Sequence, residues 1–215
     1  MKEIRIGKFS ISRDFLLFLI ATALLGVTMA VENTSFANRL AEDLEFTTMQ
    51  RTLLEIPREL PGLILFLVIG ALAFLGDIRT AAIGNILGGI GLFAFGFVQP
   101  GFWPAAITVF VYSMGQHIYF PLQGAISMTF AKDENLGRRL GEIQSVNTAA
   151  LIVTAAVLYV LYNFVDIPFS AAFSIGAVAM VLAGLTFLLM SPGPRKTGKK
   201  KIVVKKAATE KKTKA

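Results

Sequence analysis

The feature that most constrains this chain is a series of long stretches without aspartate, glutamate, lysine or arginine. They occupy residues 15–31, 60–76, 81–98, 102–131, 148–162 and 168–190. A helix needs about 17 to 25 predominantly apolar residues to cross the hydrocarbon core of a bilayer. Five stretches reach that length, and 148–162 does so once Val146 and Asn147 are included. The sequence therefore predicts an all-α membrane protein with six transmembrane helices.

Composition excludes most soluble and enzymatic classes. Of the 215 residues 54% are hydrophobic and 16% are charged, whereas charged residues make up roughly a quarter of a soluble domain. With no cysteine and one histidine, the chain cannot form a disulfide, a thiolate or multi-histidine metal site, or a cysteine nucleophile. It also has no Gly-x-Ser-x-Gly elbow and no phosphate-binding loop. We expect a protein that is not an enzyme and has no metal and no cofactor.

The basic residues predict the orientation. With six helices, 18 of the 21 lysines and arginines fall on the side of the two termini, and only Arg39, Arg51 and Arg58 fall on the other. Cytoplasmic segments carry an excess of lysine and arginine. Both termini are therefore predicted to be cytoplasmic, in a multi-pass protein of the plasma membrane, as in a prokaryotic inner membrane.

Three segments follow from this assignment: a cytoplasmic N-terminus at 1–13, a six-helix bundle at 14–190 and a basic tail at 191–215. The tail carries ten lysines and arginines and no aromatic residue that could stack on bases. We expect it to be disordered and to contact the anionic surface of the lipid bilayer rather than nucleic acid. The sharper alternative is a tail that binds a partner such as ribosomal RNA.

A cytoplasmic connection at 132–142 divides the bundle into three helices plus three. Because three is odd, the second triplet starts on the opposite side of the membrane, as in a 3+3 inverted repeat. Pro57 and Pro61 are expected to bracket the start of the second helix. Gly84 and Gly88 offer a small face for close helix packing.

Polar side chains at membrane depth are site candidates, because each costs a few kcal/mol unless it meets water or a partner. Glu32 and Asn33 follow the first apolar stretch. If the first helix continues through Ala37, Glu32 lies on a water-filled path and could bind a cation or carry a proton. If that helix ends at Val31, Glu32 is an ordinary interfacial acid.

The fourth stretch carries Gln116 and His117 near its centre, with Gln123 two turns beyond Gln116. Tyr112 and Tyr119 share a helical face with Gln116. This polar stripe either forms hydrogen bonds that hold neighbouring helices together or lines a cavity.

Arg58 belongs to the beginning of the second helix. If that helix starts near Gln50, Arg58 could neutralise Glu55, Glu59 or Glu32. The alternative is a surface ion pair that contributes little stability.

Two cytoplasmic segments resemble sequences of the major facilitator superfamily of transporters. The turn Ala71-Leu72-Ala73-Phe74-Leu75-Gly76-Asp77-Ile78-Arg79 resembles the family signature between the second and third helices, and Leu136-Gly137-Arg138-Arg139-Leu140-Gly141 resembles its loop between the fourth and fifth. Six helices that run into a basic segment resemble the amino-terminal half of such a transporter. The resemblance implies a cytoplasmic gate made by Asp77, Arg79, Arg138 and Arg139, and a substrate path along the first and fourth helices.

The function predicted from residues and resemblance together is secondary active transport of an unidentified small solute by alternating access. The candidate substrate-binding residues are Glu32, Asn33, Arg58, Gln116, His117 and Gln123. Alternating access needs a second six-helix half, either in the same chain of a longer protein or in a homodimer. The alternative function is a non-transporting six-helix membrane scaffold whose basic tail recruits a partner.

Overall fold

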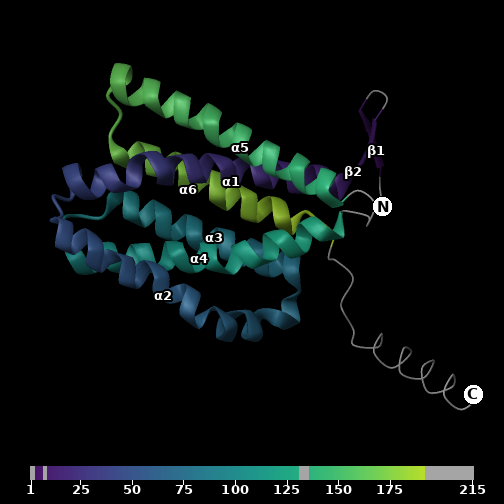
Figure 1. Ribbon diagram of the computed structural model, residues 1–215, viewed down its shortest axis with the longest axis horizontal. Coiled ribbons are helices and arrows are strands. Elements are labelled where there is room, and N and C mark those ends of the chain that lie inside the picture. The colour runs from purple at the N-terminus through teal and green to yellow at the C-terminus, as the bar shows by residue number, and fades with distance from the viewer. Residues whose placement is uncertain (1–2, 7–8, 131–135, 192–215) are drawn as a thin grey trace, which may run out of the picture.

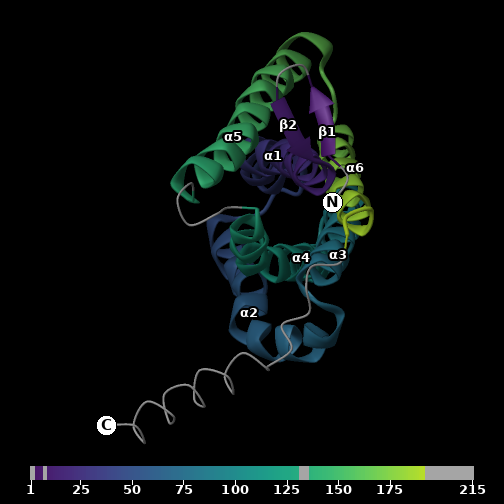
Figure 2. The ribbon, with the colours of Figure 1, turned by 90° about the vertical axis from the view of Figure 1, so that its right-hand side faces the viewer.

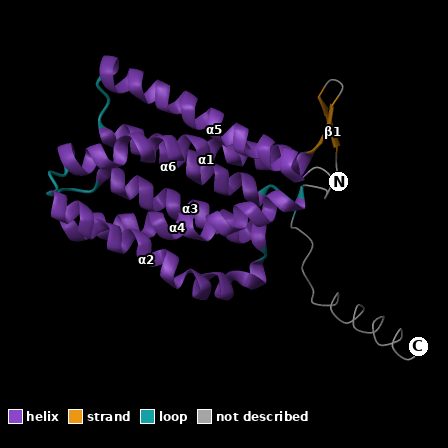
Figure 3. Ribbon diagram, viewed as in Figure 1, coloured by secondary structure: helices purple, strands orange, loops and turns teal. Residues whose placement is uncertain are grey.

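Six long helices form the computed structural model, which describes residues 3–6, 9–130 and 136–191 (Figures 1 and 3). The helices are α1 (Arg13–Asn38), α2 (Thr48–Leu72), α3 (Asp77–Phe97), α4 (Phe102–Thr129), α5 (Leu136–Val160) and α6 (Phe169–Leu188). Short helical turns extend three of them, at Arg39–Asp43 after α1, Ala73–Leu75 after α2 and Leu161–Val165 after α5. An antiparallel hairpin of β1 (Glu3–Ile6) and β2 (Phe9–Ser12) precedes α1, so the helical bundle is all-α but the N-terminal segment is not.

Five of the six helices are long and apolar enough to cross a membrane. The exception among the described residues is α4, which has 28 residues but carries polar side chains along its length. Gln116, His117 and Gln123 lower its mean hydropathy, so length and composition support five spans rather than the predicted six. The protein is embedded in the membrane, and α4 lies within the same bundle.

Helix pairing follows a regular pattern (Figure 2). The α3 helix packs on α6 and on α4, α1 packs on α6 and on α5, and α2 packs on α4. Exchanging the first three helices with the last three leaves these five main pairs unchanged, whereas the smaller α4–α5 contact has no counterpart of similar size between α1 and α2 in the described residues. As a result α5 and α2 lie at opposite edges of the bundle.

The described ends of the bundle come together. The backbone N–H of Ser191, just after α6, donates to Asp14 Oδ1 at the start of α1, at 3.3 Å. The first and last helices therefore begin and end at the same end of the bundle (Figure 1). We call the opposite end, where α1 ends and α6 begins, the distal end.

The helices extend beyond the apolar stretches. Helix α2 begins at Thr48, where Thr47 and Gln50 form a capping box: Gln50 N–H donates to Thr47 Oγ1 at 3.3 Å and Thr47 N–H to Gln50 Oε1 at 2.9 Å. Pro57 and Pro61 lie inside this helix, so the prediction that they bracket its start is wrong. The cap, rather than the prolines, sets the start.

The predicted connection at 132–142 is also shorter than expected. Helix α5 begins at Leu136, so most of that segment is helical. Residues 131–135 and the basic tail from 192 onward lie outside the described residues, and the prediction of a disordered tail is untested.

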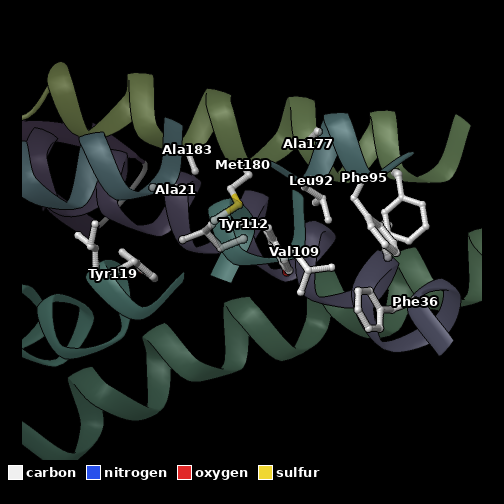
Figure 4. Close-up of a cluster of buried hydrophobic side chains, with 14 of the residues drawn as sticks. Ala21, Phe36, Leu92, Phe95, Val109, Tyr112, Tyr119, Ala177, Met180 and Ala183 are labelled. Carbon is white, nitrogen blue, oxygen red and sulfur yellow. The ribbon is translucent and has the colours of Figure 1, made fainter. Parts of the chain in front are cut away.

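Small residues let α3 approach α4, which confirms the predicted role of the glycines. A Cβ placed on Gly84 would lie 2.8 Å from the Ile118 side chain, and one on Gly115 would lie 2.4 Å from the backbone of Gly88. Buried side chains from α1, α3, α4 and α6 fill the space beside this contact (Figure 4), among them Phe36, Leu92, Phe95, Val109, Tyr112, Ala177 and Met180. Lipid gives no hydrophobic driving force between helices, so this close packing supplies much of their attraction.

Hydrogen bonds supplement the packing around α1. Thr28 Oγ1 donates to Gly176 O of α6 at 2.9 Å, and Asn147 Nδ2 of α5 donates to Thr22 O at 3.1 Å. Both bonds are buried, and each joins helices far apart in the sequence.

We expect Gly115→Ala to lower the free energy of unfolding by about 1–3 kcal/mol, because its methyl group overlaps the α3 backbone. Gly124→Ala on the same helix is the matched control: nothing lies within 4 Å of its Cβ position, so the better helix propensity of alanine should leave stability unchanged or raise it by up to ~1 kcal/mol. Unfolding in detergent micelles measures both. Equal changes in the free energy of unfolding for the two substitutions would contradict the close contact between Gly115 and α3.

Candidate functional site

Glu32 lies in the interior of α1, which continues six residues past it to Asn38. The alternative in which the first helix ends at Val31 is therefore wrong. The Glu32 side chain is only 12% exposed. Its carboxylate faces α4 rather than solvent, because both oxygens take partners from other helices.

Helix α4 supplies two donors to this carboxylate. The Tyr112 hydroxyl donates to Glu32 Oε2 at 2.6 Å, and Gln116 Nε2 donates to the same oxygen at 2.8 Å. Gln116 Nε2 also lies 2.7 Å from the Tyr112 hydroxyl, so the three groups form a closed cluster. The one-turn spacing of Tyr112 and Gln116 places both on the same face of α4.

Helix α2 supplies the positive charge. Arg58 Nη2 lies 3.4 Å from Glu32 Oε1, and Arg58 Nη1 lies 3.2 Å from Glu55 Oε1. The guanidinium carbon stands 5.3 Å from the centre of the Phe36 ring, a cation–π distance. Arg58 therefore bridges two carboxylates over an aromatic ring, and the structure brings together Glu32, Arg58 and Gln116 as predicted.

His117 joins the cluster through Ser113. Ser113 Oγ donates to the backbone carbonyl of Arg58 and lies 3.0 Å from His117 Nδ1. On the other side of the ring, His117 Nε2 is 3.8 Å from Glu59 Oε2, an ion pair only when the imidazole is protonated. Gly62 of α2 packs against the ring, since a Cβ there would lie 3.0 Å from it. His117 thus fixes α2 against α4.

The remaining predicted substrate-binding residues lie apart from this cluster. Asn33 is exposed on the surface of α1, and Gln123 is half-buried two turns along α4 from Gln116. Among the described residues, neither side chain hydrogen-bonds to Glu32 or Arg58. The members that were not among the predicted site residues are Ser113, Tyr112, Glu55 and Glu59. The sequence had already indicated Tyr112 on the i, i+4 stripe of α4 and the two glutamates as partners of Arg58.

The predicted gate residues sit at the end of the bundle that holds Asp14 and Ser191. Asp77 is the first residue of α3 and directly follows Gly76, whose φ of +80° favours glycine. Asp77 and Arg79 are exposed. Within the described residues, Arg138 and Arg139 pair with Glu142 at 3.0 and 2.8 Å rather than with Asp77.

Arg39 is a buried cation that the sequence analysis treated only as a basic residue of the outer side. It is 4% exposed, and its guanidinium donates to Phe95 O at 3.1 Å and to Val98 O at 2.9 Å. It also pairs with Asp43 one turn away. Arg39 thereby satisfies carbonyls at the C-terminal end of α3, where a positive charge is favourable. The signal in the sequence that could have identified Arg39 as a buried residue was its place directly after α1, where the helix continues.

A pocket of about 960 Å³ opens at the distal end beside Arg39. Segments around the ends of α1, α3 and α5 and the start of α6 line it. Glu32, Arg58, Gln116 and His117 do not line it. The cluster around Glu32 and the distal pocket are separate features of the bundle.

We expect Arg39→Gln to lower the free energy of unfolding by about 2–4 kcal/mol, because the carbonyls of Phe95 and Val98 lose a charged donor. The exposed Arg79 is the matched control, and Arg79→Gln should change stability by less than about 0.5 kcal/mol. Thermal unfolding in micelles compares the two. A similar small shift for both variants would remove the assigned role of Arg39.

Comparison with known proteins gives the family. The sequence profile described as "Major Facilitator Superfamily" matches residues 18–214. Macrolide efflux protein A of Enterococcus faecalis is 27% identical over 114 residues, which cover 53% of this chain and 33% of that protein. The chain thus aligns with about a third of the length of this curated relative. No solved structure matches. Members of this superfamily are transporters, and because the profile covers most of the chain, the protein belongs to the Major Facilitator Superfamily.

Proposed function

We propose that this chain is a secondary active transporter, or the N-terminal half of one, that moves a small solute across the membrane by alternating access. The observation that carries the proposal is the Glu32 carboxylate, which lies inside a membrane helix and is held by Tyr112, Gln116 and Arg58 from two other helices. Intramembrane ionisable groups of this kind mark solute and ion pathways.

The exposure of neighbouring charges supports a hydrated path rather than lipid contact. At its outer side the cluster includes Glu55, which pairs with Arg58 and is 50% exposed, and Glu59, which lies beside His117 and is 66% exposed. Glu59 directly precedes the apolar stretch 60–76. A carboxylate exposed to hydrocarbon would cost several kcal/mol. This face of α1, α2 and α4 is therefore expected to meet water or a second bundle.

The pairing of the helices supports the proposal that this chain forms one six-helix half of a transporter that works by alternating access. Pairs that survive exchange of the two triplets are what a 3+3 inverted repeat produces. The edge helices α2 and α5 expose large apolar side chains such as Phe66 and Ile152, and a second six-helix half could cover them. That half would belong to the same chain in a longer protein, or to a second copy in a homodimer.

The proposal also covers the orientation of the chain, the membrane in which it lies and its cytoplasmic gate. The excess of basic residues supports cytoplasmic termini in a plasma membrane, and the bacterial source of the relative is consistent with a prokaryotic inner membrane. Asp77, Arg79, Arg138 and Arg139 would then lie at the cytoplasmic end, where they could hold a gate. Because the relative is named for macrolide efflux, a macrolide is a sensible first solute.

We expect Glu32→Gln and Gln116→Ala each to reduce solute flux by at least about tenfold, because each removes a member of the polar cluster. Flux is measured in proteoliposomes that contain the chain, alone and with any downstream half, for a solute panel that includes a macrolide. The substitutions remove the charge of Glu32 and the amide donor of Gln116, respectively.

Two exposed residues provide matched controls. Glu45→Gln removes a carboxylate outside the cluster, and Gln144→Ala removes an amide from the exposed surface of α5. Both should leave flux within about twofold of the unsubstituted protein. Flux that survives both Glu32→Gln and Gln116→Ala would contradict the proposed site.

The absence of native cysteine permits a clean test of orientation. In intact cells, a membrane-impermeant maleimide should label Glu45→Cys, and it should label Arg79→Cys only after the membrane is permeabilised. Both positions are exposed, at opposite ends of the bundle. The reverse labelling pattern would invert the proposed topology.

A further inference from the structure

We propose that the distal pocket is a second binding site, separate from the cluster around Glu32, and that it takes a bulky organic cation. The pocket has a volume of about 960 Å³, near the upper end of the range for small-molecule sites of about 300–1,000 Å³. Its walls come from three segments that are far apart in the sequence. They are the end of α1 with its π-helical turn, residues 96–100, and the continuous stretch from the end of α5 through its own π-helical turn to residue 170.

The charge of the lining is negative. Glu42, Asp43 and Asp166 line the pocket, and the only basic residue among its lining residues is Arg39. Arg39 pairs with Asp43 and donates its other hydrogen bonds to backbone carbonyls of α3 and the segment after it. Its charge is therefore already compensated, and the carboxylates of Glu42 and Asp166 give the pocket a net charge that attracts cations.

Neither of these two carboxylates forms an ion pair within the part of the chain that the structure describes. Both side chains are exposed at the pocket, so a ligand can reach them without breaking a protein contact. Asp166 has a φ of +57° at the end of the π-helical turn of α5. Asparagine tolerates that conformation as aspartate does, which makes Asp166→Asn a conservative substitution.

Aromatic rings form the other part of the recognition surface. Tyr162 and Phe169 line the pocket with their ring centres 5.5 Å apart, and Phe97 and Tyr159 are further lining residues. A hydrogen bond of 2.8 Å between the Tyr162 hydroxyl and Ser35 Oγ fixes the first ring. A cation gains energy over the face of an aromatic ring. Carboxylates and rings around one large opening match a ligand that is both positively charged and apolar.

The aromatic wall and the volume together exclude the simpler occupants. A metal ion would need several oxygen ligands close together, whereas the described residues contain no group of three or more acidic or histidine side chains that could hold one. A small inorganic cation would use neither the rings nor most of the volume. The chemistry therefore favours an organic cation with aromatic or quaternary character.

Tetraphenylphosphonium is the probe, and triphenylphosphine oxide is its neutral counterpart. Calorimetric titration of the full chain in neutral detergent should show binding of the cation and at least about tenfold weaker binding of the neutral compound. The double variant Glu42→Gln/Asp166→Asn should weaken cation binding by about tenfold or more. Phe169→Leu should weaken it by about threefold or more, because the ring is lost and the apolar volume is largely kept.

A matched control and a folding test accompany these variants. Glu45→Gln removes a nearby carboxylate that does not line the pocket, and it should retain cation binding within about twofold. Thermal unfolding checks that each variant is folded. The double variant leaves Glu32 unchanged, so a loss of cation binding in it assigns that binding to the pocket. Equal binding of both probes, or unchanged cation affinity in a folded double variant, would overturn the proposal.

Discussion

A carboxylate buried between helices cannot remain without partners, because burial removes the water that would solvate it. In this protein the carboxylate is that of Glu32, and its partners come from α4 and α2: Tyr112 and Gln116 donate hydrogen bonds and Arg58 supplies the charge. These contacts tie α1 to the next helix along the chain, α2, and to the more distant α4. The position of the cluster therefore depends on how the whole bundle packs, and any change in that packing alters the environment of the charge.

The packing that holds these helices together depends on small residues as well as on buried apolar side chains. Gly84, Gly88 and Gly115 bring the backbones of α3 and α4 into contact. That contact sets the distance of α4 from the rest of the bundle and hence the reach of Tyr112 and Gln116 to Glu32. Helix α2 adds to the arrangement through Gly62, which leaves space for the His117 ring. Close packing and polar contacts thus together determine where α4 and α2 lie relative to α1.

Charge is distributed between two places along the bundle. The cluster around Glu32 combines acids with Arg58 and has partners for its buried groups. The distal pocket also contains an arginine, but Arg39 is engaged with Asp43 and with carbonyls after and within the last turn of α3. Glu42 and Asp166 remain at the surface of the pocket. A solute that carries positive charge would meet acids at both places, with aromatic rings at the second.

The sequence by itself determined that this is a helical membrane protein, because uncharged stretches of sufficient length have few other stable structures. It made Glu32, Arg58 and Gln116 candidates because polar groups within or next to such stretches are conspicuous. Pro57 and Pro61 indicate a later start of α2 than the structure has, whereas the alternative start near Gln50 is close to the observed one at Thr48. Only the tertiary structure decided which donors reach Glu32, that Arg39 is buried against the end of α3, and that three distant segments line a pocket. These features depend on contacts between helices, and local sequence patterns carry the period of a helix but not the identity of its neighbour.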